Sequence, residues 1–320
     1  MGVTTRRCAA GSRVRIIGMA LGLCVVVDRA PDHRFEKGYE VTSVQDSAFE
    51  GRAWDGWTVP EIVDVQGVPT AFRRGGRGET LVYLHGGGGT RAWTPLHAKL
   101  AEHFDVIAPE HPGYGDTPRG SDQDSWADYV LHYDALFRTL GLVDFHLVGT
   151  SLGSWLAANL AVYYPDRFKS LALVTPIGVL AESDEFVDLF RLTAEEEADR
   201  MFNGRAERYA DDFEQEGPLA DAVHQYQENS TSALLMWNPR YERKFDTRLA
   251  RVKIPTLVVA AEDDRLAGNG QGQRYVELLP HARLVTVRGP GGEASGHGLP
   301  MEQPADLVAE IVKHVARRGE

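Results

Sequence analysis

Ser151 lies between two glycines at a point where an extended pattern gives way to a helical one. The apolar stretch DFHLVG (144–149) is typical of a buried strand, and LGSWLAANLAVYY (152–164) is typical of a helix. The junction GTSLG (149–153) matches G-x-S-x-G, in which a serine occupies a sharp, strained strand-to-helix turn with its hydroxyl exposed. Glycines on both sides leave room for the strand and the helix to pass. The junction therefore predicts a serine nucleophile at the edge of a sheet.

Strand patterns alternate with helix patterns from residue 59 onward. We expect strands in EIVDVQ (61–66), VPTAFRR (68–74), TLVYLHG (80–86), DVIAPEH (105–111), DFHLVG (144–149), SLALVTP (170–176), TLVVAA (256–261) and ARLVTV (282–287). Helix patterns lie between them, such as residues 125–141, which have one apolar face, Ser125 as cap and Gly141 as stop. This alternation predicts an α/β fold with a mostly parallel eight-stranded sheet flanked by helices.

Bulk composition excludes several classes of protein. A chain of 320 residues with 43% hydrophobic content can form one sizeable core. The net charge of −12 repels phosphate backbones, so we expect no nucleic-acid partner. The only cysteines are Cys8 and Cys24, so no disulfide framework, thiolate zinc site or cysteine nucleophile is expected after them. The histidines form no spacing expected for a metal site, and we expect neither a metal nor another cofactor.

Residues 1–56 match no pattern that we can interpret and are treated as an N-terminal extension of unknown role. Residues 1–27 contain four arginines, no acid and a twelve-residue apolar stretch, 16–27, which is too short to span a bilayer. A charged start before a short apolar stretch is similar to a secretory signal, but no small-x-small cleavage pattern follows. We expect a cytoplasmic protein without a stable membrane span, with secretion through residues 1–27 as the alternative.

About 75 residues separate the strands 170–176 and 256–261, which is long for an unstructured connection. The segments EFVDLFRLT (185–193) and GPLADAVHQYQENSTSALLMW (217–237) have helical patterns. Residues 178–253 are therefore expected to form a helical cap, or lid. This segment contains 17 acidic and 10 basic residues, a bias that we interpret as a solvated outer face.

A second glycine-rich stretch, HGGGG (85–89), ends the strand 80–86. Glycines there allow a backbone N–H to approach a site without a Cβ in the way. We expect an oxyanion hole formed by the N–H groups of Gly87, or alternatively Gly88, and Leu152. Loss of one such donor typically lowers the rate by roughly a hundred- to a thousandfold.

A serine nucleophile needs a base, and the base needs a carboxylate to orient it. Asp263 and Asp264 follow the strand 256–261, at the end of the sheet where the sites of open α/β proteins lie. Asp264 is the better candidate and Asp263 the alternate. His297 is the only histidine in a loop after the last strand and before the final helix, so we expect it to be the base.

Together these motifs resemble the α/β-hydrolase fold superfamily, in its branch with a helical cap between strands six and seven. The resemblance spans about residues 59–317 and depends on LVYLHGGGG, VIAPEHPGYGDTP, GTSLG, IPTLVVAAEDDRL and GHGLPMEQPADL. It implies a hydrolase core of residues 57–177 and 254–320, with residues 178–253 as the cap. It also implies that Ser151 is the nucleophile, Asp264 the acid and His297 the base.

Three features depart from the family's usual pattern. Ala261 occupies a position where the family usually has glycine, and the stretch 289–296 before His297 is longer and richer in glycine than usual. Gly298 follows the histidine, where relatives that hydrolyse carbon–carbon bonds tend to have tryptophan. Aspartate is the nucleophile in epoxide hydrolases and haloalkane dehalogenases of this fold, whereas position 151 is serine.

These features predict a serine hydrolase that cleaves a small or medium carboxylic ester, or a lactone, through an acyl-enzyme. Met236 and Trp237 are the residues that we expect to form an apolar wall of the substrate pocket. The alternatives are a carbon–carbon bond hydrolase with the same triad, a cofactor-free haloperoxidase-like activity, and a weakly hydrolytic small-molecule receptor. Fold-level analogy alone does not choose among these substrates, and the oligomeric state is left open.

Overall fold

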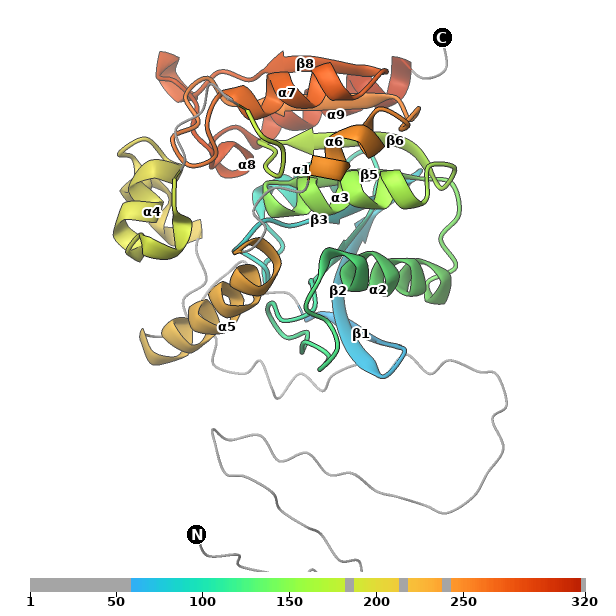
Figure 1. Cartoon of the computed structure of the whole chain (residues 1–320). Coiled ribbons are helices and arrows are strands. Elements are labelled where there is room, and N and C mark those ends of the chain that lie inside the picture. The colour runs from blue at the N-terminus through green and yellow to red at the C-terminus, as the bar shows by residue number, and fades with distance from the viewer. Residues whose placement is uncertain (1–58, 182–186, 213–217, 238–242, 318–320) are drawn as a thin grey trace, which may run out of the picture. The chain divides into compact units, whose positions relative to one another are not determined.

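Eight strands form one sheet in the computed structural model, which describes residues 59–181, 187–212, 218–237 and 243–317 (Figure 1). The expectations for residues 1–56, including the secretory signal, therefore concern residues outside the described part. The strands are β1 Glu61–Val65, β2 Val68–Gly76, β3 Thr80–Leu84, β4 Asp105–Pro109, β5 Phe145–Thr150, β6 Phe168–Val174, β7 Thr256–Ala260 and β8 Ala282–Thr286. Each of the eight predicted strands is confirmed, with ends shifted by a few residues.

The strand order is β1-β2-β4-β3-β5-β6-β7-β8. β1 and β2 pair antiparallel through the turn of Gln66 and Gly67, whose positive φ values of 55° and 91° suit a tight hairpin. β2 also pairs antiparallel with β4, and every later pairing is parallel. The predicted fold class, a mostly parallel eight-stranded sheet, is confirmed.

Helices connect and cover these strands. They are α1 Pro95–Ala101, α2 Trp126–Thr139, α3 Leu152–Tyr163, α4 Ala194–Met201, α5 Pro218–Met236, α6 Arg243–Leu249, α7 Gly270–Leu278, α8 Leu299–Glu302 and α9 Pro304–Ala316, with 3-10 turns η2 Leu189–Arg191, η3 Ala206–Asp212 and η4 Pro290–Gly292. Ser125 caps α2 as predicted, because its hydroxyl accepts a hydrogen bond from Asp128 N. Gly141 follows the end of α2 with a φ of 66°.

Two apolar clusters lie on opposite faces of the sheet. One joins the sheet to α2, α3, α6 and α7, and includes Tyr133, Leu156 and Tyr275. The other joins it to α1, α8 and α9, and includes Leu100 and Ile311. Because helices cover both faces, the central strands are buried along their whole length; all six residues of β5 are buried.

The chain between β6 and β7 contains η2, α4, η3, α5 and α6 in its described part. The predicted helix of residues 217–237 is confirmed as α5, a helix of 19 residues. The prediction for residues 185–193 is wrong where it can be compared, because residues 187–193 contain only the 3-10 turn η2. α4 and α5 lie to one side of the sheet and of the helices that flank it (Figure 1).

Candidate active site

The turn between β5 and α3 has the strained backbone predicted for it. Ser151 has φ 51° and ψ −115°, a region that side-chain-bearing residues rarely adopt. A Cβ at Gly149 would lie 2.2 Å from the carbonyl oxygen of Gly153, and a Cβ at Gly153 would lie 2.2 Å from that of Leu84. No side chain fits at such distances, so both glycines are required for α3 to start directly above β3 and β5.

Ser151, His297 and Asp264 form a continuous chain of hydrogen bonds. His297 Nε2 lies 2.8 Å from Ser151 Oγ, and His297 Nδ1 lies 2.8 Å from Asp264 Oδ2. His297 is 5% and Asp264 7% exposed, so these contacts are largely shielded from water. An ionised carboxylate only accepts hydrogen bonds, so Nδ1 donates to Asp264 and Nε2 is free to accept from the serine hydroxyl. The three residues come from elements far apart in sequence.

Asp264, and not Asp263, contacts the histidine. Asp264 Oδ1 accepts hydrogen bonds from the backbone N–H groups of Leu266 at 3.1 Å and Ala267 at 2.8 Å, which fix the carboxylate. Asp263 instead accepts a hydrogen bond from Arg265 Nε at 2.8 Å in a largely exposed pair. The turn after β7 therefore directs these neighbouring acids to different partners.

Residues that follow β7 and β8 hold the loop before His297 from one side. Ser295 Oγ donates to Val287 O at 2.6 Å and accepts from Glu262 N at 2.8 Å. Glu262 Oε2 in turn accepts from the N–H groups of Gly289 at 3.2 Å and Ser295 at 3.4 Å. The long glycine-rich loop is thus tied at both of its ends to the end of β7 and to the residue that follows β8.

Glu302 of α8 and residues from the segment between β6 and β7 hold the same loop from the other side. Glu302, whose side chain is fully buried, accepts from Arg205 at 2.5 Å with Oε1 and from Gly296 N at 2.7 Å with Oε2. Gly298 N donates to Met201 O at 2.9 Å. The backbone is therefore held directly before and directly after His297.

Gly298 also has a steric role. A Cβ there would lie 2.3 Å from the ring of Phe202, which is fully buried and stacks on Tyr209 with ring centroids 4.6 Å apart. Phe202 therefore occupies the space into which a larger residue at 298 would project. A tryptophan at this position would displace it.

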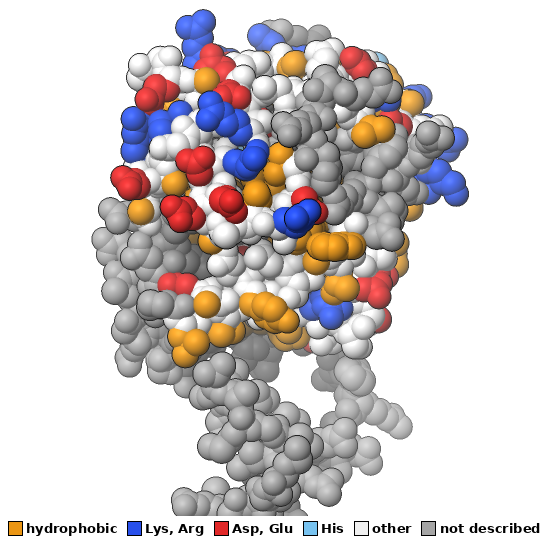
Figure 2. Space-filling model, turned by 60° about the vertical axis from the view of Figure 1, so that its left-hand side comes forward, with side chains coloured by type: hydrophobic (Ala, Val, Ile, Leu, Met, Phe, Trp, Pro, Cys, Tyr) orange, Lys and Arg blue, Asp and Glu red, His pale blue; other side chains and the backbone are white. Residues whose placement is uncertain are grey.

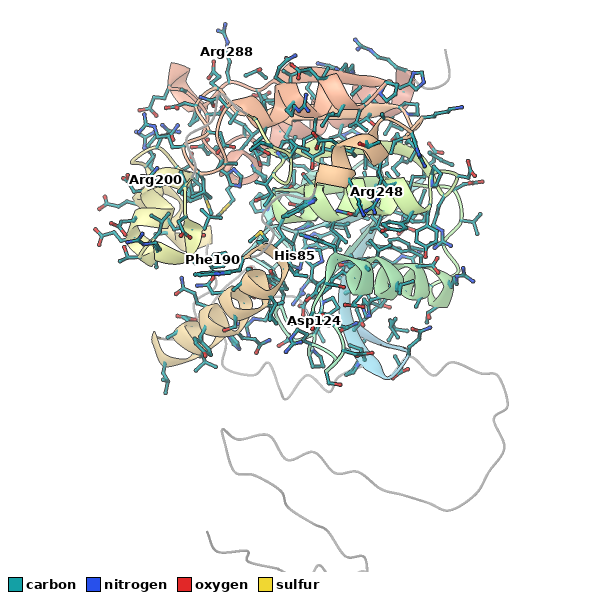
Figure 3. The ribbon with its side chains drawn as sticks, in the orientation of Figure 1. His85, Asp124, Phe190, Arg200, Arg248 and Arg288 are labelled. Atoms are coloured by element: carbon teal, nitrogen blue, oxygen red, sulfur yellow. The ribbon has the colours of Figure 1, made fainter. Side chains whose placement is uncertain are left out.

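The glycine-rich loop after β3 is oriented by His85, which is labelled in Figure 3. His85 Nε2 accepts from His111 N at 2.9 Å, so its proton resides on Nδ1, which donates to Gly86 O at 2.7 Å. Burial lowers the pKa of His85 to about 3, which keeps this tautomer neutral. In a trans peptide the Gly87 N–H points opposite to the Gly86 carbonyl, and hence away from His85.

Of the predicted oxyanion donors, Leu152 directly follows Ser151, and Gly87 directly follows the residue through which the glycine loop approaches the serine. A Cβ at Gly86 would lie 3.4 Å from Ser151 Cβ, so the glycine loop passes directly beside the serine. Gly87 and Gly88 are exposed, and a Cβ on either would meet nothing within 4 Å. Leu152 is the first residue of α3, where helical N–H groups have no intrahelical acceptor.

The two predicted pocket residues lie at the end of α5. Met236 is half-buried against the core, whereas Trp237 is 53% exposed. The Trp237 ring lies 5.4 Å from that of Phe190, which Figure 3 places between α4 and α5. Trp237 belongs to a series of exposed hydrophobic residues on α5 and at its end: Leu219, Val223, Tyr226, Leu234 and Trp237. Figure 2 shows hydrophobic side chains gathered on the lower part of this face, below acidic and basic ones.

Buried polar contacts attach α5 to the loop after β4. Glu228 Oε1 accepts from Thr90 Oγ1 at 2.8 Å and from Gly115 N at 3.1 Å. Tyr114 and Ser232 share a hydrogen bond of 2.6 Å between their hydroxyl oxygens. α5 is therefore fixed beside the loop HGGGG and the site by specific polar contacts.

Within the described residues, no group of three or more histidine, cysteine, aspartate or glutamate side chains is placed to hold a metal ion. None of the described helices combines the length and the apolar character that crossing a membrane requires. Sequence reasoning missed Arg205 and Glu302. The only available signal was the position of Glu302, five residues after His297 in the same motif.

Comparison with known proteins now adds to this geometry. The pattern of the alpha/beta hydrolase family matches residues 81–311. The chain belongs to this family.

Two curated relatives match different shares of the chain. The first is the dihydrolipoyllysine-residue acetyltransferase component of the acetoin cleaving system of Cupriavidus necator, 36% identical over 123 residues, which are 37% of this chain and 32% of that protein. The chain thus matches about a third of this relative's length. The second is the 2-hydroxy-6-oxo-6-(2'-aminophenyl)hexa-2,4-dienoic acid hydrolase of Metapseudomonas resinovorans, 22% identical over 82% of this chain and 92% of that protein.

Among solved structures, the naproxen esterase of Bacillus subtilis is similar, with a TM-score of 0.61 and 20% identity. The matched region covers 81% of this chain and 92% of the esterase chain. At this level of identity the likeness shows the shared fold. The named activities of these similar proteins include an esterase and a dienoic acid hydrolase.

Proposed function

We propose that the protein is a serine hydrolase that cleaves a small or medium carboxylic ester, or a lactone. The observation that carries the proposal is the hydrogen-bonded chain from Ser151 Oγ through His297 to Asp264. Such a chain lets a neutral imidazole remove the serine proton as the hydroxyl oxygen attacks a carbonyl carbon. The buried Asp264 carboxylate holds the tautomer that this step requires and stabilises the imidazolium that forms.

Each later step uses a group already near Ser151. The negative charge on the substrate oxygen would be stabilised by the N–H groups of Gly87 and Leu152, at the start of α3. His297 then gives its proton to the leaving alcohol, and a water molecule, activated by the same histidine, hydrolyses the acyl-enzyme. The reaction balances without a cofactor. Residues 178–253 would form the cap over this site, between core parts 57–177 and 254–320, with Met236 and Trp237 in the wall of the pocket. We place the activity in the cytoplasm, with secretion through residues 1–27 as the alternative.

A carbon–carbon bond hydrolase is the second candidate, because the relative from Metapseudomonas resinovorans, named as a hydrolase of a dienoic acid, covers 82% of this chain. The close packing of Phe202 against Gly298 favours an ester hydrolase over a carbon–carbon bond hydrolase. It leaves no room for the tryptophan that the carbon–carbon branch tends to have after the histidine.

Hydrolysis of p-nitrophenyl esters of two to eight acyl carbons tests the proposal. We expect turnover by the wild type and a loss of at least about a thousandfold in Ser151→Ala. The control is Ser230→Ala, which removes an exposed hydroxyl on α5 and should leave turnover unchanged. Among the described residues, this hydroxyl hydrogen-bonds only to Tyr226 of its own helix. Cleavage of a dienoate ring-fission product without ester turnover would transfer the assignment to the second candidate. Turnover of neither substrate would contradict both.

A further inference from the structure

The inner face of α5 is polar in its middle, where a helix packed on a protein is usually apolar. Glu228, Thr231 and Ser232 are buried there, with exposed fractions of 8%, 3% and 5%. On the outer side of the same helix, Leu219 and Tyr226 are exposed. The middle of α5 is therefore attached to the rest of the protein by specific polar contacts, and the partners in these contacts show what the helix holds in place.

Two polar contacts of α5 reach the end of the glycine-rich loop HGGGG (85–89). Glu228 Oε1 accepts a hydrogen bond from the hydroxyl of Thr90 at 2.8 Å. Arg91, which is 1% exposed, donates to Nδ1 of His224. Residues 224 and 228 lie about one helical turn apart on the same face of α5. α5 therefore holds both of the residues that directly follow the glycine-rich loop.

Other contacts on the inner face of α5 attach the helix to the loop after β4. Thr231 Oγ1 donates to Gly113 O at 3.3 Å. The hydroxyl of Ser232 shares a hydrogen bond of 2.6 Å with that of Tyr114. These two contacts fix α5 without touching the glycine-rich loop, so they separate attachment of the helix from any effect of the helix on that loop.

The position of the glycine-rich loop depends on its two ends. A Cβ at any of the last three glycines would meet nothing within 4 Å, so no neighbour packs on that side of the backbone. At the start of the loop, His85 Nδ1 donates to Gly86 O. At its end, the Thr90 hydroxyl is bound by Glu228. The direction of the Gly87 N–H is therefore set by these two ends, and α5 fixes one of them.

We propose that Glu228 is a positioning residue for the oxyanion hole. Through Thr90 it fixes the glycine-rich loop in the conformation that directs the Gly87 N–H to the substrate oxygen. The inference rests on the proposed ester hydrolysis. A carboxylate is a stronger acceptor than a neutral oxygen, and burial shields its bond to Thr90 from competing water. Because Glu228 belongs to the segment between β6 and β7, that segment contributes to the chemical step as well as to the shape of the pocket.

Two matched threonine variants test the proposal. Thr90→Val and Thr231→Val each replace a buried hydroxyl that joins α5 to a loop, but only Thr90 follows the glycine-rich loop. On a p-nitrophenyl ester we expect kcat to fall by about tenfold in Thr90→Val, less than the roughly hundredfold loss of a whole oxyanion donor, with KM unchanged. Thr231→Val should keep the kcat of the wild type, and Thr90→Ser, which restores the hydroxyl, should recover it. Equal kcat in Thr90→Val and Thr231→Val, or a change in KM alone, would overturn the proposal.

A double variant tests whether the effect passes through this one hydrogen bond. Glu228→Gln keeps an acceptor but removes its charge, so kcat should fall by about threefold or more. If Glu228 acts through Thr90, the double variant Glu228→Gln/Thr90→Val should be no slower than Thr90→Val alone. Losses that multiply in the double variant would overturn the role of Glu228.

Failure of the proposed function is distinguishable from failure of this inference. If the wild type turns over no ester, ester hydrolysis is contradicted, and hydrogen exchange at the amides of residues 86–91 then decides the positioning role. Exchange there should be faster in Thr90→Val and Glu228→Gln than in the wild type, and unchanged in Thr231→Val. Equal exchange in all four proteins, or equally faster exchange in all three variants, would overturn the role of Glu228.

Discussion

The turn that carries Ser151 and the loop that carries His297 meet at one hydrogen bond, but they are built differently. Ser151 is positioned by backbone sterics within a few residues. Positions 149 and 153 accept only glycine, because a Cβ at either would collide with the backbone where α3 crosses the strands. The His297 loop is held by Glu302, from the helix that follows it, and Glu302 is in turn bound by Arg205, from the distant segment between β6 and β7. The proposed nucleophile is therefore specified locally, and the proposed base is specified by the assembled fold.

The largest effect should come from the acid that orients the base. Asp264→Asn replaces an acceptor of the His297 Nδ1–H with an amide that can force the wrong tautomer, so kcat should fall by roughly 10⁴-fold. Asp263→Asn changes only a largely exposed contact with Arg265 and should alter kcat by less than about twofold. Steady-state kinetics on a p-nitrophenyl ester measures both. Equal losses in the two variants would mean that the turn after β7 does not separate the roles of these acids.

Breaking the serine turn should cost stability. Gly153→Ala places a Cβ 2.2 Å from the Leu84 carbonyl oxygen, so the free energy of unfolding should fall by more than ~3 kcal/mol. Gly87→Ala is the control, because a Cβ there meets nothing within 4 Å, and its stability should stay within ~0.5 kcal/mol of the wild type. Urea unfolding compares them. A Gly153→Ala protein as stable as Gly87→Ala would refute local steric control of the turn.

Breaking the base loop should reduce both stability and rate. Glu302→Gln leaves Arg205 without its buried counter-charge, which should destabilise the protein by about 3 kcal/mol. We also expect kcat to fall by about tenfold, because the peptide before His297 loses a charged acceptor. Glu293→Gln removes an exposed pair with Arg208 and a longer contact of 3.6 Å with Arg205, and should cost less than ~1 kcal/mol. Urea unfolding measures the loss of stability, and ester kinetics measure the loss in kcat. Equal losses in Glu302→Gln and Glu293→Gln would contradict the different roles assigned to these two acids.

The smallest expected effect is the contribution of His85, in the loop beside Ser151, to the pH dependence of stability. The pKa of His85 is about 3 in the folded protein and about 6.5 when unfolded, so the unfolded chain binds more protons between these values. Stability should therefore fall as pH decreases from about 6.5, with His85 contributing up to ~1.4 kcal/mol per pH unit. His85→Gln should lose less stability between pH 6 and 5 than the wild type, by about 1 kcal/mol. Urea unfolding at both pH values measures these losses. Equal losses in the wild type and in His85→Gln would show that His85 is not buried in its neutral form.

The sequence was sufficient for what depends on neighbouring residues. The strand-to-helix change around Ser151, the cap at Ser125 and the alternation of eight strands with helices are all local patterns, and the structure confirms them. Periodicity was insufficient in residues 187–193, where only a 3-10 turn forms. The signal that separates this segment from a helix is Thr193, which starts α4 through a capping box with Glu196.

Two features of the site depend on folding that no local pattern encodes. Asp263 and Asp264 are adjacent acids in one turn, and only the direction of that turn decides which one meets His297. The contact between Arg205 and Glu302 joins residues 97 positions apart.

Labelling with a fluorophosphonate, followed by mass-spectrometric mapping of the modified residue, tests most directly the claim that Ser151 is activated by His297. We predict one adduct on Ser151 in the wild type, no adduct in Ser151→Ala, and labelling at least about a thousandfold slower in His297→Gln. A wild-type protein that is not labelled, or labelling that persists in Ser151→Ala, would contradict the account.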